Sequence, residues 1–333
     1  MKKLKIRKTT LIRSFIFVLL VFSVTSCDSD LNSELRFTEY GSLLWLNDQM
    51  ADNVIKKAVQ YTVENSSIII AQIPWDPSDM LFMNNLDWYS SLAIQHGKGL
   101  MINVDWLSND RQSTRNSSWS FEDDSISDQF SKDMNLMVAK YKPEMLILGV
   151  EVNYYAFNSP SGYKGFVLAF NTLKNSLKEK YPKMKIGISF QLELLYGIDK
   201  NWSQIKVLQP LDAVVENLDF IGVSTYPDLH PNKEGVALLS ANYIDSLMVQ
   251  YSVPIGISET GISSLNFNKN QRSLYLQNIF SNSNRFLFIV WGSMIDSNQH
   301  SSWMSRIGLL DFNALPKEEC EVWLDEINSV KSP

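Results

Sequence analysis

The sequence contains very little cysteine and histidine, and this scarcity excludes several kinds of site. Of its 333 residues, two are cysteines (Cys27 and Cys320) and three are histidines (His96, His230 and His300). The histidines are far apart in the sequence, and none belongs to an H-E-x-x-H motif or to another metal-ligand spacing. We therefore expect neither a disulfide framework nor a metal centre.

The glycine motifs of nucleotide-binding and serine-hydrolase folds are also missing. No G-x-G-x-x-G motif follows a candidate strand, which argues against a dinucleotide site on a doubly wound sheet. The nearest match to the G-x-S-x-G nucleophile elbow, at residues 256–260, lacks the final glycine. No linker rich in Gly, Ser or Pro divides the chain, so we expect one domain over residues 35–333.

The apolar run near the N-terminus is too short to cross a bilayer as a stable helix. It spans residues 14–24 (SFIFVLLVFSV), follows a basic segment and ends in the motif Val24-Thr25-Ser26-Cys27. This pattern is typical of an export signal, and the motif resembles the lipobox of bacterial lipoproteins, with an ordinary secretory signal as the alternative. We expect a signal peptide at residues 1–26, lipidation of Cys27 and a polar tether at 27–34. The protein would then be exported and anchored by lipid in the cell envelope, at the outer membrane or the cell surface.

Positive charge becomes scarce once this signal is removed. Six of the 30 Lys and Arg residues lie in it, which leaves 24 against 36 Asp and Glu, a formal net charge of −12. Such an acidic chain is not expected to bind nucleic acid as its main partner.

The remaining chain alternates short apolar runs with amphipathic stretches. The runs lack polar alternation, as is typical of parallel strands covered on both sides. Eight strand–helix units predict a (β/α)8 TIM barrel of the α/β class, with a doubly wound open sheet as the alternative. The expected strands are 35–39, 67–73, 100–105, 145–151, 185–191, 220–225, 254–259 and 286–291, and the expected helices are 48–64, 86–96, 126–141, 163–181, 208–217, 235–251, 270–282 and 317–330.

Acidic, amide and aromatic residues follow most of these expected strands. Functional side chains of a TIM barrel gather at the C-terminal ends of its strands. Aromatic faces stack on sugar rings, while acids and amides bind hydroxyl groups, so the combination indicates a sugar site. These residues are Trp75, Asp76, Asp105, Trp106, Glu151, Asn153, Gln191, Glu193, Tyr226, Asp228, Glu259, Trp291 and Asp296.

The order of these motifs resembles clan A of the glycoside hydrolases, and most nearly its endo-β-1,4-galactanase-like families. The matching segments are residues 148–153 (LGVEVN), 220–227 (FIGVSTYP), 257–261 (ISETG) and 288–292 (FIVWG). The resemblance implies a retaining O-glycosyl hydrolase that acts on a poly- or oligosaccharide, needs no metal or organic cofactor, and has two carboxyl groups about 5–5.5 Å apart. We also expect the protein to be a monomer.

The resemblance also implies a role for each matching residue. Glu151 would be the general acid/base, Glu259 the nucleophile, and Tyr226 a hydrogen-bond donor to Glu259. Trp291 would form the floor of the sugar site, with a cis peptide bond to Gly292. The other expected sugar contacts are Trp75, Asp105, Trp106, Asn153 and Gln191.

Two departures from the clan pattern support another hypothesis. Val150 stands where the clan places an Asn that contacts the sugar 2-hydroxyl, and the Arg usual near the second strand is absent from residues 72–75 (QIPW). Asn153 is a candidate substitute for the missing Asn. The alternatives are a catalytically impaired carbohydrate-binding lipoprotein with the same barrel, or a pair of glutamates that serve in structural ion pairs.

Overall fold

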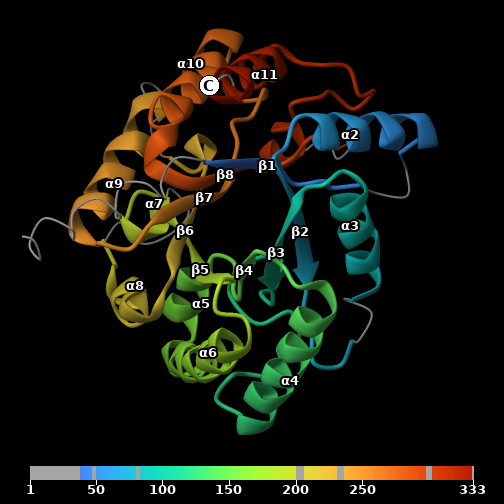
Figure 1. Ribbon diagram of the computed structural model, residues 1–333. Helices are drawn as coiled ribbons and strands as arrows, with labels where there is room; N and C mark the ends of the chain where they lie inside the picture. The colour runs from blue at the N-terminus through green and yellow to red at the C-terminus, as the bar shows by residue number, and fades with distance from the viewer. Residues whose placement is uncertain are drawn as a thin grey trace, which may run out of the picture.

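The computed structural model describes residues 38–46, 50–79, 83–199, 206–230, 236–297 and 302–331. The expected signal peptide, Cys27 and the tether lie outside these residues. Figure 1 shows eight strands in the centre, surrounded by helices. The strands are β1 (Glu39–Ser42), β2 (Ile68–Pro74), β3 (Gly99–Asp105), β4 (Met145–Ile147), β5 (Lys185–Gln191), β6 (Phe220–Thr225), β7 (Ile255–Thr260) and β8 (Phe286–Trp291).

The strands form one parallel sheet that curls into a nearly closed barrel. The hydrogen-bonded order is β1-β8-β7-β6-β5-β4-β3-β2. The remaining seam between β1 and β2 is joined by the backbone N–H of Ser67, which donates to the Tyr40 carbonyl oxygen at 2.8 Å, and by the Tyr40 N–H, which donates to Ser67 Oγ at 2.7 Å. The predicted (β/α)8 TIM barrel is therefore confirmed.

The helices wrap the barrel in chain order. Because the ring must close, the last helix, α11, packs beside the first strand: the rings of Trp323 and Tyr40 meet edge to face, 6.5 Å between centroids. Cys320 on α11 is a buried, free thiol. The helices are α2 (Asp52–Glu64), α3 (Asn84–Gln95), α4 (Asp124–Tyr141), α5 (Val152–Asn158), α6 (Pro160–Lys180), α7 (Leu192–Leu195), α8 (Gln209–Asp212), α9 (Val236–Gln250), α10 (Lys269–Phe280) and α11 (Glu318–Lys331).

Apolar side chains fill the inside of the barrel as well as the layer between sheet and helices. The interior cluster includes Ile70, Met101, Ile147, Val150 and Phe288, all buried. A second, larger cluster joins the outer faces of the strands to the helices. Filling the interior in this way leaves room for a site only above it, at one end of the barrel.

Three expected elements differ from the structure. The first strand is β1 rather than residues 35–39; residues 35–37 lie outside the described residues. β4 ends at Ile147 instead of Glu151, because the chain turns there and Glu151 adopts a left-handed backbone (φ 54°) before α5 begins. The expected helix 208–217 is only the short α8 followed by a 3-10 turn at Val215–Asn217.

Candidate active site

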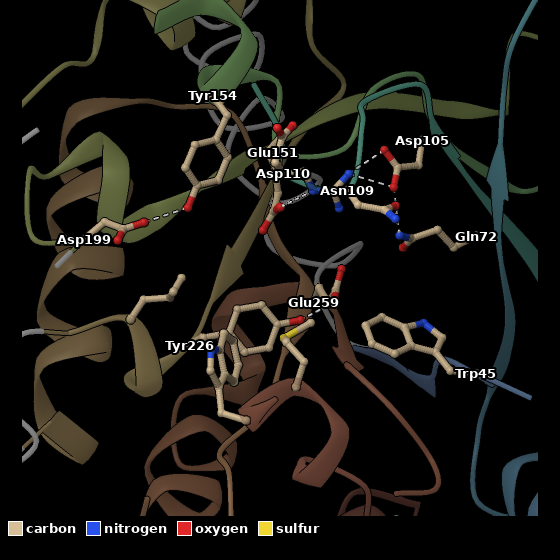
Figure 2. Close-up of a pocket in the computed structure, with 14 residues that line it drawn as sticks. Trp45, Gln72, Asp105, Asn109, Asp110, Glu151, Tyr154, Asp199, Tyr226 and Glu259 are labelled. Carbon is tan, nitrogen blue, oxygen red and sulfur yellow. Dashed lines mark hydrogen bonds and ion pairs between the residues drawn. The ribbon is translucent and has the colours of Figure 1, made fainter. Parts of the chain in front are cut away.

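The C-terminal ends of the strands surround a cavity of about 510 Å³. Its wall takes residues from the ends of all eight strands or from the segments after them, including Tyr154 in the first turn of α5. In Figure 2, Glu151 and Glu259 face the same space from opposite sides. The lining residues are Trp45, Gln72, Asp105, Asn109, Asp110, Arg111, Glu151, Tyr154, Asp199, Tyr226, Leu229, Glu259, Trp303 and Met304.

Glu151 is held at both oxygen atoms of its carboxylate. Ser224 on β6 donates a hydrogen bond to Oε1 at 2.6 Å, and Arg111 forms an ion pair with Oε2 at 3.0 Å from its Nε. Both partners come from other elements of the barrel, so they fix the side chain from two directions. A carboxylate in such a buried position requires partners of this kind.

Arg111 reaches the cavity from the loop after β3. Its Nη1 lies 2.6 Å and 2.7 Å from the two carboxylate oxygens of Asp105, the last residue of β3. The guanidinium therefore bridges Asp105 and Glu151. Burial lowers the pKa of Arg111, but the neighbouring carboxylates of Asp105 and Glu151 together raise it by more, so the guanidinium stays charged.

Glu259, at the end of β7, has a less polar environment than Glu151. It is 3% exposed and accepts a hydrogen bond from the hydroxyl group of Tyr226. Burial, followed by the negative charge of Glu151, raises the pKa of Glu259 to about 8, while Tyr226 and Arg111 act in the opposite direction. The two glutamates thus share a cavity but differ in what surrounds them.

Two further carboxylates, those of Asp199 and Glu193, belong to the same end of the barrel. The hydroxyl group of Tyr154 donates to Asp199 Oδ2 at 2.7 Å, and both residues line the cavity. Glu193 lies behind the wall, where it accepts hydrogen bonds from the hydroxyl group of Thr225 (2.8 Å) and the backbone N–H of Tyr226 (3.0 Å). Burial raises the pKa of Glu193 to about 7.

The cavity also has two indole rings and one unpaired acceptor. Trp45 and Trp303, both half-buried, line it, and the Trp303 ring packs edge-on against Tyr226 at 5.1 Å. Gln72 on β2 donates a long hydrogen bond to Asp105 at 3.4 Å, but its Oε1 is buried without a partner.

The three tryptophans expected to bind sugar lie in the core instead. Trp75, Trp106 and Trp291 are fully buried, and none lines the cavity. Their indole N–H groups are bonded internally, to Asp133 Oδ2 (3.1 Å), to the Leu148 carbonyl oxygen (3.0 Å) and to the Ile307 carbonyl oxygen (2.7 Å) respectively. Each side chain turns to the outer face of the sheet, where large apolar groups are required. The Trp291–Gly292 peptide bond, expected as cis, is trans.

The two expected amide contacts are also structural. The side chain of Asn153 exchanges two hydrogen bonds of 2.8 Å with the backbone of Gln191, is 2% exposed and does not line the cavity. The side chain of Gln191 bonds to Glu193 and caps the first turn of α7. Asn153 is therefore not a substitute for the Asn that the clan has at the position of Val150. Val150 itself belongs to the apolar cluster inside the barrel.

Of the expected site residues, Glu151, Glu259, Asp105 and Tyr226 come together around the cavity. Sequence reasoning missed Trp45, Gln72, Arg111, Tyr154 and Trp303. Gln72 lies near the end of β2, and the other four lie in the segments that follow β1, β3, β4 and β8, so their position alone carried a signal. Nothing in the sequence distinguished Trp45 and Trp303 from the tryptophans that pack in the core.

Within the ranges that the structure describes, no group of three or more His, Cys, Asp or Glu residues is placed to hold a metal ion. In the same ranges, no helix is both long enough and apolar enough to cross a membrane.

Comparison with known proteins identifies the fold. No family model and no curated protein matches the sequence. Among solved structures, the chain is similar to a β-glucosidase from Thermotoga maritima in complex with castanospermine (TM-score 0.60, 12% identity, 84% of this chain and 86% of the other). It is also similar to the exo-β-1,4-mannosidase Op5Man5 from Opitutaceae bacterium strain TAV5 (TM-score 0.67, 13% identity, 88% of this chain and 59% of the other). A third similar structure is a β-glucosidase from Exiguobacterium marinum (TM-score 0.58, 13% identity, 84% and 87%). At this level of identity, the likeness establishes that the chain has the TIM-barrel fold of these glycosidases.

Proposed function

We propose that the protein is a retaining glycoside hydrolase in which Glu151 is the general acid/base and Glu259 the nucleophile. The observation that carries the proposal is the placement of both glutamates in one cavity, Glu151 in the turn after β4 and Glu259 at the end of β7, with Tyr226 bonded to Glu259. Two carboxyl groups that face one bond are the chemical requirement for this reaction. The shared fold of the similar glycosidases adds support.

The reaction would proceed in two displacements. A carboxylate oxygen of Glu259 attacks the anomeric carbon while the bond to the leaving oxygen breaks, and that oxygen takes the proton of Glu151. The Glu151 carboxylate then takes a proton from water, whose oxygen attacks the same carbon and releases Glu259. Because the configuration inverts twice, the product keeps the anomeric configuration of the substrate.

The charges of the cavity favour a neutral sugar as the substrate. Five carboxylates line the cavity against one guanidinium, and that guanidinium already contacts Asp105 and Glu151. A uronic acid or a sulfated sugar would therefore be repelled. Trp45 and Trp303 offer faces for pyranose rings.

The expected lipid anchor at Cys27 belongs to the same proposal. A carbohydrate-degrading enzyme at the cell envelope would meet glycans outside the cell, and the lipobox-like motif would fix it there. Export of the full chain in a bacterial host tests this: the wild type should partition into the detergent phase and incorporate labelled fatty acid, and Cys27→Ser should do neither. A wild type that stays in the aqueous phase would rule out the anchor.

A carbohydrate-binding lipoprotein without catalysis is the second candidate. Val150 favours it, because this side chain is 2% exposed within the apolar interior and cannot contact a sugar hydroxyl. Contacts to the 2-hydroxyl that strengthen in the transition state contribute several kcal/mol in this chemistry. A binder would retain affinity for a glycan when either glutamate is changed to glutamine.

The two candidates separate in a panel of substrates. We would offer 4-nitrophenyl β-glucoside, β-mannoside, β-galactoside, β-xyloside and β-glucuronide, together with soluble β-glycans including galactan, to the wild type, Glu151→Gln and Glu259→Gln. A hydrolase should cleave a neutral substrate, spare the glucuronide, and lose about 10²-fold or more of its rate in either variant. Binding by isothermal titration calorimetry without turnover would favour the carbohydrate-binding protein.

A further inference from the structure

The cavity contains a single basic side chain among the described residues that line it, and this side chain contacts the expected acid/base. Arg111 forms an ion pair with Glu151 and with Asp105. Its side chain is 20% exposed, so water screens these contacts only in part. The charge of this one guanidinium therefore has a large influence on the two glutamates.

The loop that carries Arg111 is held in shape by its own hydrogen bonds. A backbone bridge pairs Leu107 with Thr114, and the Arg111 N–H donates to the Ser108 carbonyl oxygen at 2.9 Å. Arg111 has a left-handed backbone (φ 63°), as Glu151 does (φ 54°). Non-glycine residues in this region are strained, and they gather at functional sites. Both ends of this ion pair are thus presented by strained backbone.

We propose that Arg111, anchored by Asp105, is a positioning residue that fixes the side chain of Glu151 and places one positive charge beside the glutamate pair, so that Glu259 can lose its proton and act as the nucleophile. The role of Glu259 as the nucleophile rests on the proposed function. The effect of the Arg111 charge on the protonation of Glu259 does not depend on it.

The electrostatic surroundings of Glu259 support this role. Burial and the charge of Glu151 raise the pKa of Glu259 to about 8, Asp105 adds to that increase, and Arg111 is the one cation that counteracts them. Removing the Arg111 charge should therefore raise the pKa of Glu259 further. The charged and titratable groups around the pair are Asp105, Asp110 and Arg111 from β3 and its loop, Tyr154 from α5, Glu193 and Asp199 from the segment after β5, and Tyr226 from the end of β6.

The test is a titration of Glu259 that does not depend on activity. The full chain is labelled with ¹³Cδ-glutamate, and the Glu259 resonance is assigned by its disappearance in Glu259→Gln. We expect its midpoint near 8 in the wild type and about one pH unit or more higher in Arg111→Gln. Arg111→Lys retains the charge and should stay near the wild type.

Two further variants make the result interpretable. Arg111→Gly also removes the charge and fits the left-handed backbone better, so it serves if Arg111→Gln fails to fold. Arg115→Gln removes an exposed positive charge from the same loop, near Asp76 rather than the glutamates, and should leave Glu259 unchanged.

A Glu259 midpoint that stays at the wild-type value in a folded, neutral Arg111 variant would overturn the proposal. A midpoint that rises equally in Arg115→Gln would do the same. The hydrolase proposal fails by a separate result: the wild type cleaves no glycoside, at any value of the Glu259 midpoint. If glycosides are cleaved, the acid limb of kcat/KM should shift to higher pH in Arg111→Gln and return in Arg111→Lys.

Discussion

A single hydroxyl group distinguishes the surroundings of Glu259 from those of an ordinary buried acid. Tyr226 donates to its carboxylate, is itself buried, and is braced by the ring of Trp303. This hydrogen bond favours the ionised form of Glu259, against burial and the charge of Glu151. At the scale of one residue, the reactivity proposed for Glu259 thus depends on atoms contributed by β6 and its loop.

We predict that Tyr226→Phe lowers kcat/KM about 10-fold or more, since a hydrogen bond to a charged group contributes about 1.5–3 kcal/mol. The pKa of Glu259 rises when the donor is lost, and Glu259 must be ionised to attack, so the acid limb of the pH profile should move to higher pH. Tyr163→Phe is the matched control, because it loses a buried hydroxyl bonded to the Pro210 carbonyl oxygen outside the cavity. Equal losses in both variants would contradict the role of Tyr226.

Val150→Asn introduces the residue that the clan has at this position, but its side chain would not reach a sugar in the cavity. The side chain at this position packs inside the barrel, so the new amide would be buried without partners. We predict a loss of about 1–3 kcal/mol in the free energy of unfolding, measured in urea, and no gain in activity. A rise in kcat/KM would show that position 150 reaches the substrate after all.

At the scale of elements, the tryptophans fall into two groups that the sequence does not separate. Trp106 follows β3 and is buried against Phe121 and Phe166, whereas Trp303 lies in a 3-10 turn after β8 and lines the cavity. A shift of one residue in register moves a side chain at a strand end to the other face of the sheet. For a tryptophan in a loop, the conformation of the loop decides whether the ring faces the cavity or the core. Patterns of residue type cannot resolve either.

We predict opposite effects for the two groups. Trp106→Ala should cost about 3–5 kcal/mol of stability, as for other large-to-small changes in a core. Trp303→Ala should change stability by less than about 1 kcal/mol but reduce kcat/KM or glycan affinity about 10-fold, since it removes a ring face from the cavity. Trp88, which is 41% exposed on α3, provides a control in which neither quantity should change. The measurements are urea unfolding and kinetics; a stable Trp106→Ala would refute the assignment.

The elements themselves were largely predictable, because their signals are local. The bounds of β5, β6 and β8 follow directly from apolar runs, and the carboxylates at the ends of β4 and β7 follow from the rule that barrel sites form there. The early end of β4 and the helix α5 were not predictable, since both depend on the left-handed backbone of Glu151. Arg111 was missed for a related reason: its contact with Glu151 depends on the shape of a loop.

At the scale of the whole molecule, buried acids make stability depend on pH. The pKa of Glu193 is raised to about 7 and that of Glu259 to about 8, both above the ordinary value of 4.5. The folded state therefore holds protons that the unfolded chain releases above about pH 4.5, and stability falls as the pH rises towards 8. The aspartates with lowered pKa values contribute only below this window.

We predict that the free energy of unfolding in urea is lower at pH 8 than at pH 5 by at least about 1 kcal/mol, because one pKa unit corresponds to about 1.4 kcal/mol. Glu259→Gln keeps this site neutral at every pH, and the decrease should be smaller in this variant. A stability that is flat or that increases from pH 5 to pH 8 would contradict the raised pKa values.

The most direct test of the central claim is the anomeric configuration of the first product. ¹H NMR spectra are recorded within minutes of adding wild-type protein to the neutral β-glycoside that the panel identifies, with Glu151→Gln and Glu259→Gln in parallel. We predict that the β-anomer appears first and mutarotates afterwards, and that neither variant forms it at a comparable rate. An α-anomer as the first product, or hydrolysis that persists in both variants, would contradict a retaining mechanism carried by Glu151 and Glu259.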